Sequence, residues 1–188
     1  MITVFGEGRG FRVAWLLEEM RLAYTLRPVD LLSDVAQDAA FMAVNPAGFI
    51  PALQDDDVVM VESIAIMEYL TARYGPNPLA PGPDDPEFPN YQQFLHLGEA
   101  GLAMPANALF VGRHLAPEAE RDAYLVRWAR GTLESRLRLV TRRLASARYM
   151  AGDRFTAADI SVTYALEMAQ RHGSVRLGEA ERAYVART

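Results

Sequence analysis

A glycine-rich loop near the start of the chain, residues 6–10 (Gly-Glu-Gly-Arg-Gly), has the composition of a segment that can bind an anion. The apolar run Ile2–Phe5 before it predicts a strand, and the apolar spacing within Phe11–Leu22 after it predicts a helix. Loops of this kind bind dinucleotide phosphates when their glycines follow a G-x-G-x-x-G pattern. Here the glycines alternate and Arg12-Val13 fill the last positions of the pattern, so the sequence gives little support for nucleotide binding.

The residue types that the chain lacks exclude several kinds of chemistry. None of its 188 residues is cysteine, which rules out disulfides, thiolate metal sites and cysteine nucleophiles. All 19 basic residues are arginine, which rules out Schiff-base chemistry and a phosphate-binding loop that depends on lysine. We therefore expect no metal cofactor.

Charge is distributed unevenly along a chain whose net charge is −5. Residues 1–77 hold 5 Arg against 11 Asp and Glu, whereas residues 88–188 hold 14 Arg against 10 Asp and Glu. This asymmetry indicates two units with different surfaces, although a set of ordinary solvated helix faces would also produce it. The arginines between residues 136 and 148 lack interleaved aromatic residues, so we predict no nucleic-acid partner.

Two features of the sequence indicate where in the cell the protein is expected to be. No apolar run approaches the roughly 20 residues that cross a bilayer, so we expect no membrane partner. Met1 leads directly into the first predicted strand, without the basic region of a secretion signal. We therefore expect a cytoplasmic protein.

Residues 45–70 predict a turn, a strand, a turn, a strand and a helix, in that order. The initial Asn-Pro-Ala-Gly is a turn cluster, and the short apolar run after it contains Pro51. Proline cannot donate to a sheet ladder, so Pro51 fits the start of a strand, with either peptide isomer. Asp55–Asp57 predicts a hairpin turn before the strand Val58–Val61, and a helix begins at Glu62-Ser63.

With a further strand at Tyr24–Leu31 and a short helix at Asp34–Ala43, the first part of the chain predicts the order β-α-β-α-β-β-α. The proline-rich segment 77–89 has the composition of a linker, and only helical signals follow it. We therefore expect domains at 1–76 and 90–188. The predicted helices of the second domain are Tyr91–Arg113, with a possible kink near Pro105, then Pro117–Ala147, Ala151–Gln170 and Glu179–Thr188.

The third of these helices has a clear start signal. Thr156 and Asp159 have the spacing of a capping box, and Phe155 and Ile160 that of a hydrophobic staple. Gly173 can end the helix.

Four segments, in order, resemble motifs of the glutathione S-transferase superfamily, of the bacterial type and of unclear class. The first helix is similar over Phe11–Glu19, Asn45–Leu53 resembles N-P-x-G-K-[VI]-P-x-L, Val61–Ile66 resembles E-S-x-A-I, and Gly152–Ile160 resembles the capping motif of the second domain. The similarity covers nearly the whole chain. It implies an α/β plus all-α fold, in which a thioredoxin-like N-terminal domain precedes a helical-bundle C-terminal domain, and a homodimer.

The resemblance also implies a glutathione site. Pro51 would be a cis proline, and the backbone of Ile50 would pair with glutathione as an added strand does. Ser63 would meet the γ-glutamyl carboxylate at a helix N-terminus, and Glu62 would pair with the ammonium group. A plain helix cap is the alternative for Glu62 and Ser63. Phe49 stands where the family commonly has lysine or glutamine touching the ligand.

The sequence departs from the family at the position of the residue that activates the thiol of glutathione. Relatives use Tyr, Ser or Cys near the end of the first strand, but residues 4–23 contain none of these and no threonine. Our hypothesis is that the N–H groups of Gly10 and Phe11, with the charge of Arg9, stabilise the thiolate of glutathione. The alternative for Arg9 is a solvent-exposed loop residue.

The leading prediction is an enzyme that adds glutathione to hydrophobic electrophiles, in detoxification. Two alternatives remain open: a glutathione-dependent peroxidase or reductase that works without a protein cysteine, and a non-catalytic glutathione or ligand-binding protein. The candidate residues for an electrophile pocket, which could equally be core residues, are Met104, Pro105, Phe110 and Tyr164. The candidates for a dimer interface are Met60, Met67, Tyr69 and Tyr91.

Overall fold

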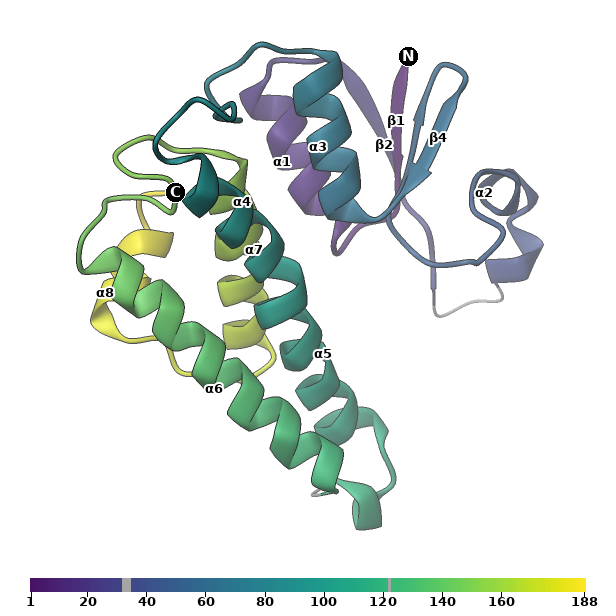
Figure 1. Ribbon diagram of the computed structural model, residues 1–188. Helices are drawn as coiled ribbons and strands as arrows, with labels where there is room; N and C mark the ends of the chain where they lie inside the picture. Colours follow the sequence, from purple (N-terminus) through teal and green to yellow (C-terminus); the bar gives the residue numbers. More distant parts are fainter. Residues whose placement is uncertain (32–34, 122) are drawn as a thin grey trace. The chain divides into compact units, whose positions relative to one another are not determined.

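The computed structural model describes residues 1–31, 35–121 and 123–188, and it divides into two compact units, residues 1–77 and 78–188 (Figure 1). The first unit is a mixed sheet with helices, and the second is helical. The predicted thioredoxin-like domain followed by a helical bundle is confirmed.

The first unit has the predicted order β-α-β-α-β-β-α, with one additional short 3₁₀ turn. Its elements are β1 (Ile2–Phe5), α1 (Gly10–Glu19), β2 (Tyr24–Arg27), η1 (Val35–Gln37), α2 (Ala39–Val44), β3 (Ala52–Asp55), β4 (Val58–Val61) and α3 (Ser63–Arg73). The strands lie in the order β2-β1-β3-β4, with β1 and β2 parallel and the other two pairs antiparallel.

Two predicted elements in this unit were too long, and a third is divided in the structure. Helix α1 ends at Glu19 instead of Leu22, and β2 ends at Arg27 because Pro28 follows and cannot donate to the ladder. The predicted helix Asp34–Ala43 is replaced by η1 and α2, and its first residue lies outside the described residues. Asp38 begins α2, since its carboxylate accepts from the Phe41 amide at 3.0 Å.

Side chains along β1 point alternately to the two faces of the sheet, and helices pack against both faces. Helices α1 and α3 lie side by side over one face of the sheet, where Val4 is fully buried (Figure 1). The next residue, Phe5, points to the other face and packs against Phe41 of α2, with ring centroids 6.1 Å apart, and against Ala52 of β3. The two central strands, β1 and β3, are therefore mostly buried on both faces.

The second unit is built from helices, several of which pack against α7. Its helical elements are α4 (Phe88–His96), the π-helical η2 (Leu97–Ala103), α5 (Met104–Phe110), the π-helical η3 (Val111–Leu115), the 3₁₀ turn η4 (Glu118–Glu120), α6 (Tyr124–Leu144), α7 (Ala157–Arg171) and α8 (Glu179–Val185). No helix within the described residues is both long and apolar enough to span a membrane.

The proline-rich segment before α4 is attached to this unit. The Leu79 carbonyl accepts from the Ala157 amide at 2.9 Å, at the start of α7. Two ion pairs add to this attachment, Arg154 with Asp85 and Arg143 with Glu87.

The helix predicted at Tyr91–Arg113 is longer and less regular than expected, because it runs as α and π turns from Phe88 to Leu115. Pro105 has no N–H to donate to the Gly101 carbonyl, and the wider π turns of η2 precede it. Gly98 lies in η2 where the segment crosses α7, and a Cβ there would come within 2.2 Å of the Ser161 hydroxyl. The glycine thus allows the close crossing.

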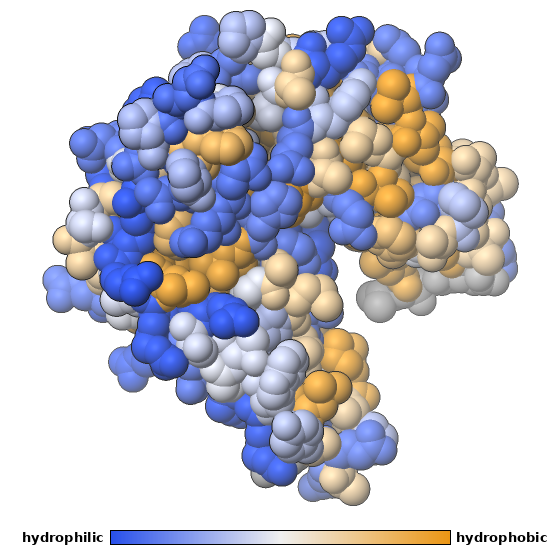
Figure 2. Space-filling view, viewed as in Figure 1, coloured by the Kyte–Doolittle hydropathy of each residue, from blue (hydrophilic) through white to orange (hydrophobic). Residues whose placement is uncertain are grey.

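Helix α6 begins at Tyr124 instead of Pro117. Helical spacing predicts one buried face made of Tyr124, Trp128, Leu133, Leu137, Val140 and Leu144. Of these residues only Leu133 and Val140 are buried. Tyr124 and Trp128 are 75% and 55% exposed, whereas Val126 and Ala129 are buried. Val111 and Leu115 of η3 are exposed as well. Figure 2 shows hydrophobic surface at the lower end of the second unit, where η3 and the start of α6 lie.

The capping signals predicted for α7 are confirmed, although the helix runs from Ala157 to Arg171 instead of from Ala151 to Gln170. The capping box of Thr156 and Asp159 is formed, and Gly173 ends the segment with a φ of +65°. Asp159 also accepts from the Met150 amide at 2.8 Å and the Tyr184 hydroxyl at 2.9 Å. Its burial raises the pKa of its carboxyl group.

The predicted dimer residues are only partly at the surface. Met67 and Tyr91 are buried in the chain, which leaves them little surface for contact with a partner subunit, and the dimer interface stays a prediction. Met60 and Tyr69 are half-buried.

Candidate functional site

The peptide bond Ile50–Pro51 is cis and lies directly before β3. It packs against the glycine-rich loop: a Cβ on Gly6 would lie 2.2 Å from Cγ2 of Ile50, and one on Gly10 would lie 3.6 Å from Cβ of Pro51. Gly6 also has a φ of +86°, which only glycine adopts readily. Gly6 therefore allows the loop to approach the cis proline, whereas a Cβ on Gly10 would make an ordinary contact there.

Asn45 fixes the segment that leads to the cis proline. Its side chain is buried, its amide group donates to the Phe49 carbonyl at 2.6 Å, and its carbonyl oxygen accepts from the Ala47 amide at 3.1 Å. Sequence analysis identified Asn45 only as part of a turn. The signal for its role was the Asn-Pro pair, because asparagine side chains bond to nearby backbone in turns.

The antiparallel register of β3 and β4 places the two predicted ligand-binding segments together. Ala52 pairs with Val61, so Pro51 and Glu62 are the next residues at the same end of the hairpin. Helix α3 begins immediately afterwards, at Ser63. Ile50, Pro51, Glu62 and Ser63 thus share one edge of the first unit.

Glu62 does not act as a simple helix cap. Its side chain is exposed and makes no capping hydrogen bond in the described structure, which disfavours the plain-cap alternative. Its φ of 71° is unusual for a residue with a side chain. Such backbone conformations concentrate at functional sites.

Arg12 is the functional candidate that sequence analysis missed. It is fully buried on α1, and its Nη1 donates to Oγ of Ser63, at the start of α3, over 3.1 Å. The bond leaves the Ser63 hydroxyl its own proton to donate. The signal in the sequence was a charged residue directly before Val13 on the apolar face of the predicted helix, because a buried charge requires polar partners.

The structure changes the account of the predicted thiolate-stabilising residues. The Gly10 amide donates to the Glu7 carbonyl and the Phe11 amide to the Gly8 carbonyl, both over 3.0 Å. These hydrogen bonds close the turn, so the prediction that the two amides are open to a thiolate is corrected. Arg9 is half-buried at the N-cap of α1, which differs from the solvent-exposed alternative.

The four predicted electrophile-pocket residues have different environments. Pro105 is buried, and the ring of Phe110 packs against His114 and His172 at centroid distances of 5.0 Å and 4.4 Å. For these two residues the core-packing alternative is favoured. Met104 is 53% exposed and Tyr164 is half-buried, and their role remains a prediction.

Both halves of the chain match models of known families. Residues 10–73 match the glutathione S-transferase N-terminal domain, and residues 65–180 match the glutathione S-transferase C-terminal domain.

Individual relatives agree with these matches. The chain is 32% identical to glutathione S-transferase 3 of Schizosaccharomyces pombe over 87% of this chain and 71% of that protein. It is 29% identical to glutathione S-transferase GstB of Escherichia coli, over 86% and 80% of the two chains. Among solved structures, the theta class enzyme of Xanthomonas axonopodis pv. citri with glutathione bound matches with a TM-score of 0.81 and 30% identity, covering 99% and 91% of the two chains. The chain therefore belongs to the glutathione S-transferase family.

Proposed function

We propose that the protein is a glutathione transferase that joins the sulfur of glutathione to hydrophobic electrophiles and thereby detoxifies them. The observation that carries this proposal is the shared edge of Ile50, Pro51, Glu62 and Ser63, with the guanidinium of Arg12 bonded to the Ser63 hydroxyl. This edge offers backbone groups, a carboxylate and a helix N-terminus to one short peptide, and the buried cation of Arg12 lies behind the Ser63 hydroxyl. Relatives with the same fold, such as the Xanthomonas enzyme, are described with glutathione bound.

Each group at this edge has a part in holding the substrate. The backbone of Ile50 pairs with the extended peptide as an added strand does. The Ser63 hydroxyl and the start of α3 bind the γ-glutamyl carboxylate, and the nearby charge of Arg12 strengthens that contact. The exposed carboxylate of Glu62 pairs with the ammonium group of glutathione.

The reaction then requires the thiol in its ionised form. A free thiol has a pKa of about 8.5, so a positive group must favour the thiolate near neutral pH. Arg9, at the N-cap of α1, is the proposed group. The thiol proton passes to solvent, the sulfur forms a bond to the electrophilic carbon, and the leaving group departs with its electron pair.

Replacing Arg9 tests this step separately. In the Arg9→Gln variant we expect the thiol pKa of bound glutathione to rise, because a nearby positive charge is lost. The matched Glu7→Gln change removes a nearby negative charge and should lower that pKa. Ultraviolet absorbance of the thiolate across a pH series measures both, and an unchanged pKa in Arg9→Gln would remove Arg9 from the mechanism.

The second candidate is a protein that binds glutathione or a related ligand without turnover. It is favoured by the closed turn of the Gly10 and Phe11 amides, and by the absence of Tyr, Ser, Cys and Thr from residues 4–23.

One set of assays on the same sample separates the two. It comprises conjugation of a chloronitrobenzene, peroxide reduction and calorimetric titration with glutathione. We expect binding with conjugation, whereas binding without any turnover would select the second candidate. A sample that does not bind glutathione would contradict the transferase, and of the second candidate it would leave only a binder of a related ligand.

A homodimer remains part of the proposal. Strand β4 is an edge strand of the sheet, and its Val58 and Val59 are 38% and 48% exposed, so it presents apolar surface to a partner. Light scattering coupled to size exclusion should give twice the chain mass of 20.9 kDa. A single-chain mass at micromolar concentration would contradict it.

A further inference from the structure

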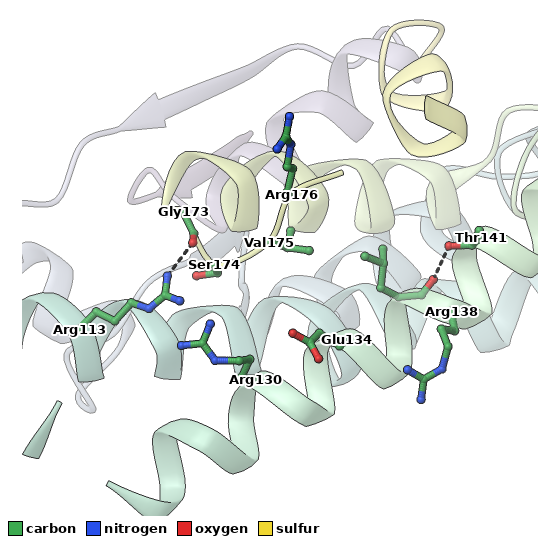
Figure 3. A pocket seen from close by; sticks show the side chains of 10 residues that line it. Arg113, Arg130, Glu134, Arg138, Thr141, Gly173, Ser174, Val175 and Arg176 are labelled. Atoms are coloured by element: carbon green, nitrogen blue, oxygen red, sulfur yellow. Dashed lines mark hydrogen bonds between the residues drawn. The ribbon is translucent and has the colours of Figure 1, made fainter. Parts of the chain in front are cut away.

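A pocket of about 670 Å³ lies within the helical unit, and no residue of the candidate glutathione site lines it. It is formed by η3, α6 and the segment that follows α7, and Figure 3 shows its side chains. Five of its lining residues carry charge: Arg113, Arg130, Glu134, Arg138 and Arg176. Pockets of 300–1,000 Å³ are the usual size for small-molecule sites.

The positive charges in this pocket are poorly neutralised. Arg130, Glu134 and Arg138 follow one another at four-residue spacing, so they lie on one face of α6. That spacing normally favours ion pairs, yet within residues 1–31, 35–121 and 123–188 no carboxylate lies within 4.0 Å of Arg130, Arg138 or Arg176. The lining thus holds four guanidinium groups against one carboxylate.

Hydrogen bonds hold in place the segment after α7 that lines the pocket. Ser174 is buried, its hydroxyl donates to the Ala106 carbonyl at 3.2 Å, and its amide donates to the Ala169 carbonyl at 2.8 Å. Arg113 donates to the Gly173 carbonyl at 2.6 Å, a bond drawn in Figure 3, which ties η3 to the same segment. Half-buried Leu137 and Val175 add apolar surface.

We propose that this pocket binds a small molecule with two or more linked phosphate groups. Arginine presents a planar fork that bonds phosphate oxygens in pairs, and several arginines require a ligand with several negative charges. Glu134 repels such groups but accepts hydrogen bonds from hydroxyls, so a sugar next to the phosphates fits beside it. Leu137 and Val175 offer a surface for an apolar part of the ligand.

A nucleic acid is a poorer match for the same charges. No aromatic side chain is among the residues that line the pocket, so the described site offers no surface on which unpaired bases could stack. The chain as a whole carries a net charge of −5, which repels a long polyanion.

Calorimetric titration without glutathione tests the proposal independently of the transferase activity. The probes are ATP, pyrophosphate, inorganic phosphate and uncharged adenosine. We expect ATP and pyrophosphate to bind more tightly than inorganic phosphate, and adenosine to bind least. We expect Arg138→Gln to bind ATP about tenfold or more weakly than the wild type, because a hydrogen bond between charged groups is removed.

Arg142→Gln is the matched control, since Arg142 is an exposed arginine one turn further along α6 and does not line the pocket. The affinity of the Arg142→Gln variant for ATP should stay within about twofold of that of the wild type. Arg176→Gln, on a different segment, should repeat the loss seen with Arg138→Gln. Absence of saturable binding below about 1 mM, equal losses in the Arg138 and Arg142 variants, or adenosine binding as tightly as ATP would each overturn the proposal.

Discussion

At the scale of single residues, the proposed glutathione site has one buried charge next to it. Arg12 lies on α1, yet its guanidinium donates to the Ser63 hydroxyl at the start of α3. A buried charge is costly unless polar groups surround it, so its retention here suits a site that receives a carboxylate. In the proposed site, Arg12 thereby connects a packing position of the first helix with recognition of the substrate.

Replacing Arg12 by methionine keeps most of the side-chain volume and removes the charge. We expect glutathione to bind at least about tenfold more weakly, because a charge-assisted contact contributes about 1.5–3 kcal/mol. Cysteinylglycine, which lacks the γ-glutamyl residue, is the control ligand and should bind both proteins alike. Calorimetry measures all four combinations, and an equal loss for both ligands would show that Arg12 supports only the fold.

At the scale of elements, features that depend on local sequence patterns were predicted correctly, whereas long-range contacts were not predicted. The hairpin after Pro51 and the capping box of Thr156 and Asp159 depend on neighbours within a few residues, and both were predicted. The Arg12–Ser63 bond joins residues 51 positions apart, so no local pattern contains it. The exposure of Tyr124 and Trp128 was missed because helical spacing identifies a stripe without identifying what covers it.

Two helical glycines test how the elements of the second unit pack. In Gly98→Ala the new Cβ would lie 2.2 Å from the Ser161 hydroxyl oxygen and 2.6 Å from the Ser161 backbone, so we expect a loss of about 1–3 kcal/mol. In Gly131→Ala the new Cβ has no neighbour within 4 Å in the described structure, and the helix should gain about 1 kcal/mol. Urea denaturation measures both, and the same sign of change in the two variants would contradict the packing described.

At the scale of the whole molecule, a histidine makes stability depend on pH. His172 packs on Phe110, and burial, together with the nearby His114 and Arg171, lowers the pKa of its imidazole below 6.5. The unfolded chain therefore takes up this proton at higher pH than the folded one does. Stability should fall as pH drops below about 6.5, until the folded protein is also protonated.

The His172→Gln variant should lose less stability than the wild type between about pH 7 and pH 5. His96→Gln is the control, since His96 is an exposed histidine on α4. Thermal unfolding followed across this pH range compares the three proteins. Parallel curves for the wild type and His172→Gln would show that another group causes the pH dependence.

The most direct test of the account is a calorimetric titration of glutathione into the wild type and into Ser63→Ala. The wild type should bind, and the variant should bind about 10- to 100-fold more weakly, because it loses the hydroxyl that faces the γ-glutamyl carboxylate while Arg12 loses its acceptor. Equal affinities in the two proteins, or no binding by the wild type, would contradict the assignment of this edge of the first unit as the glutathione site.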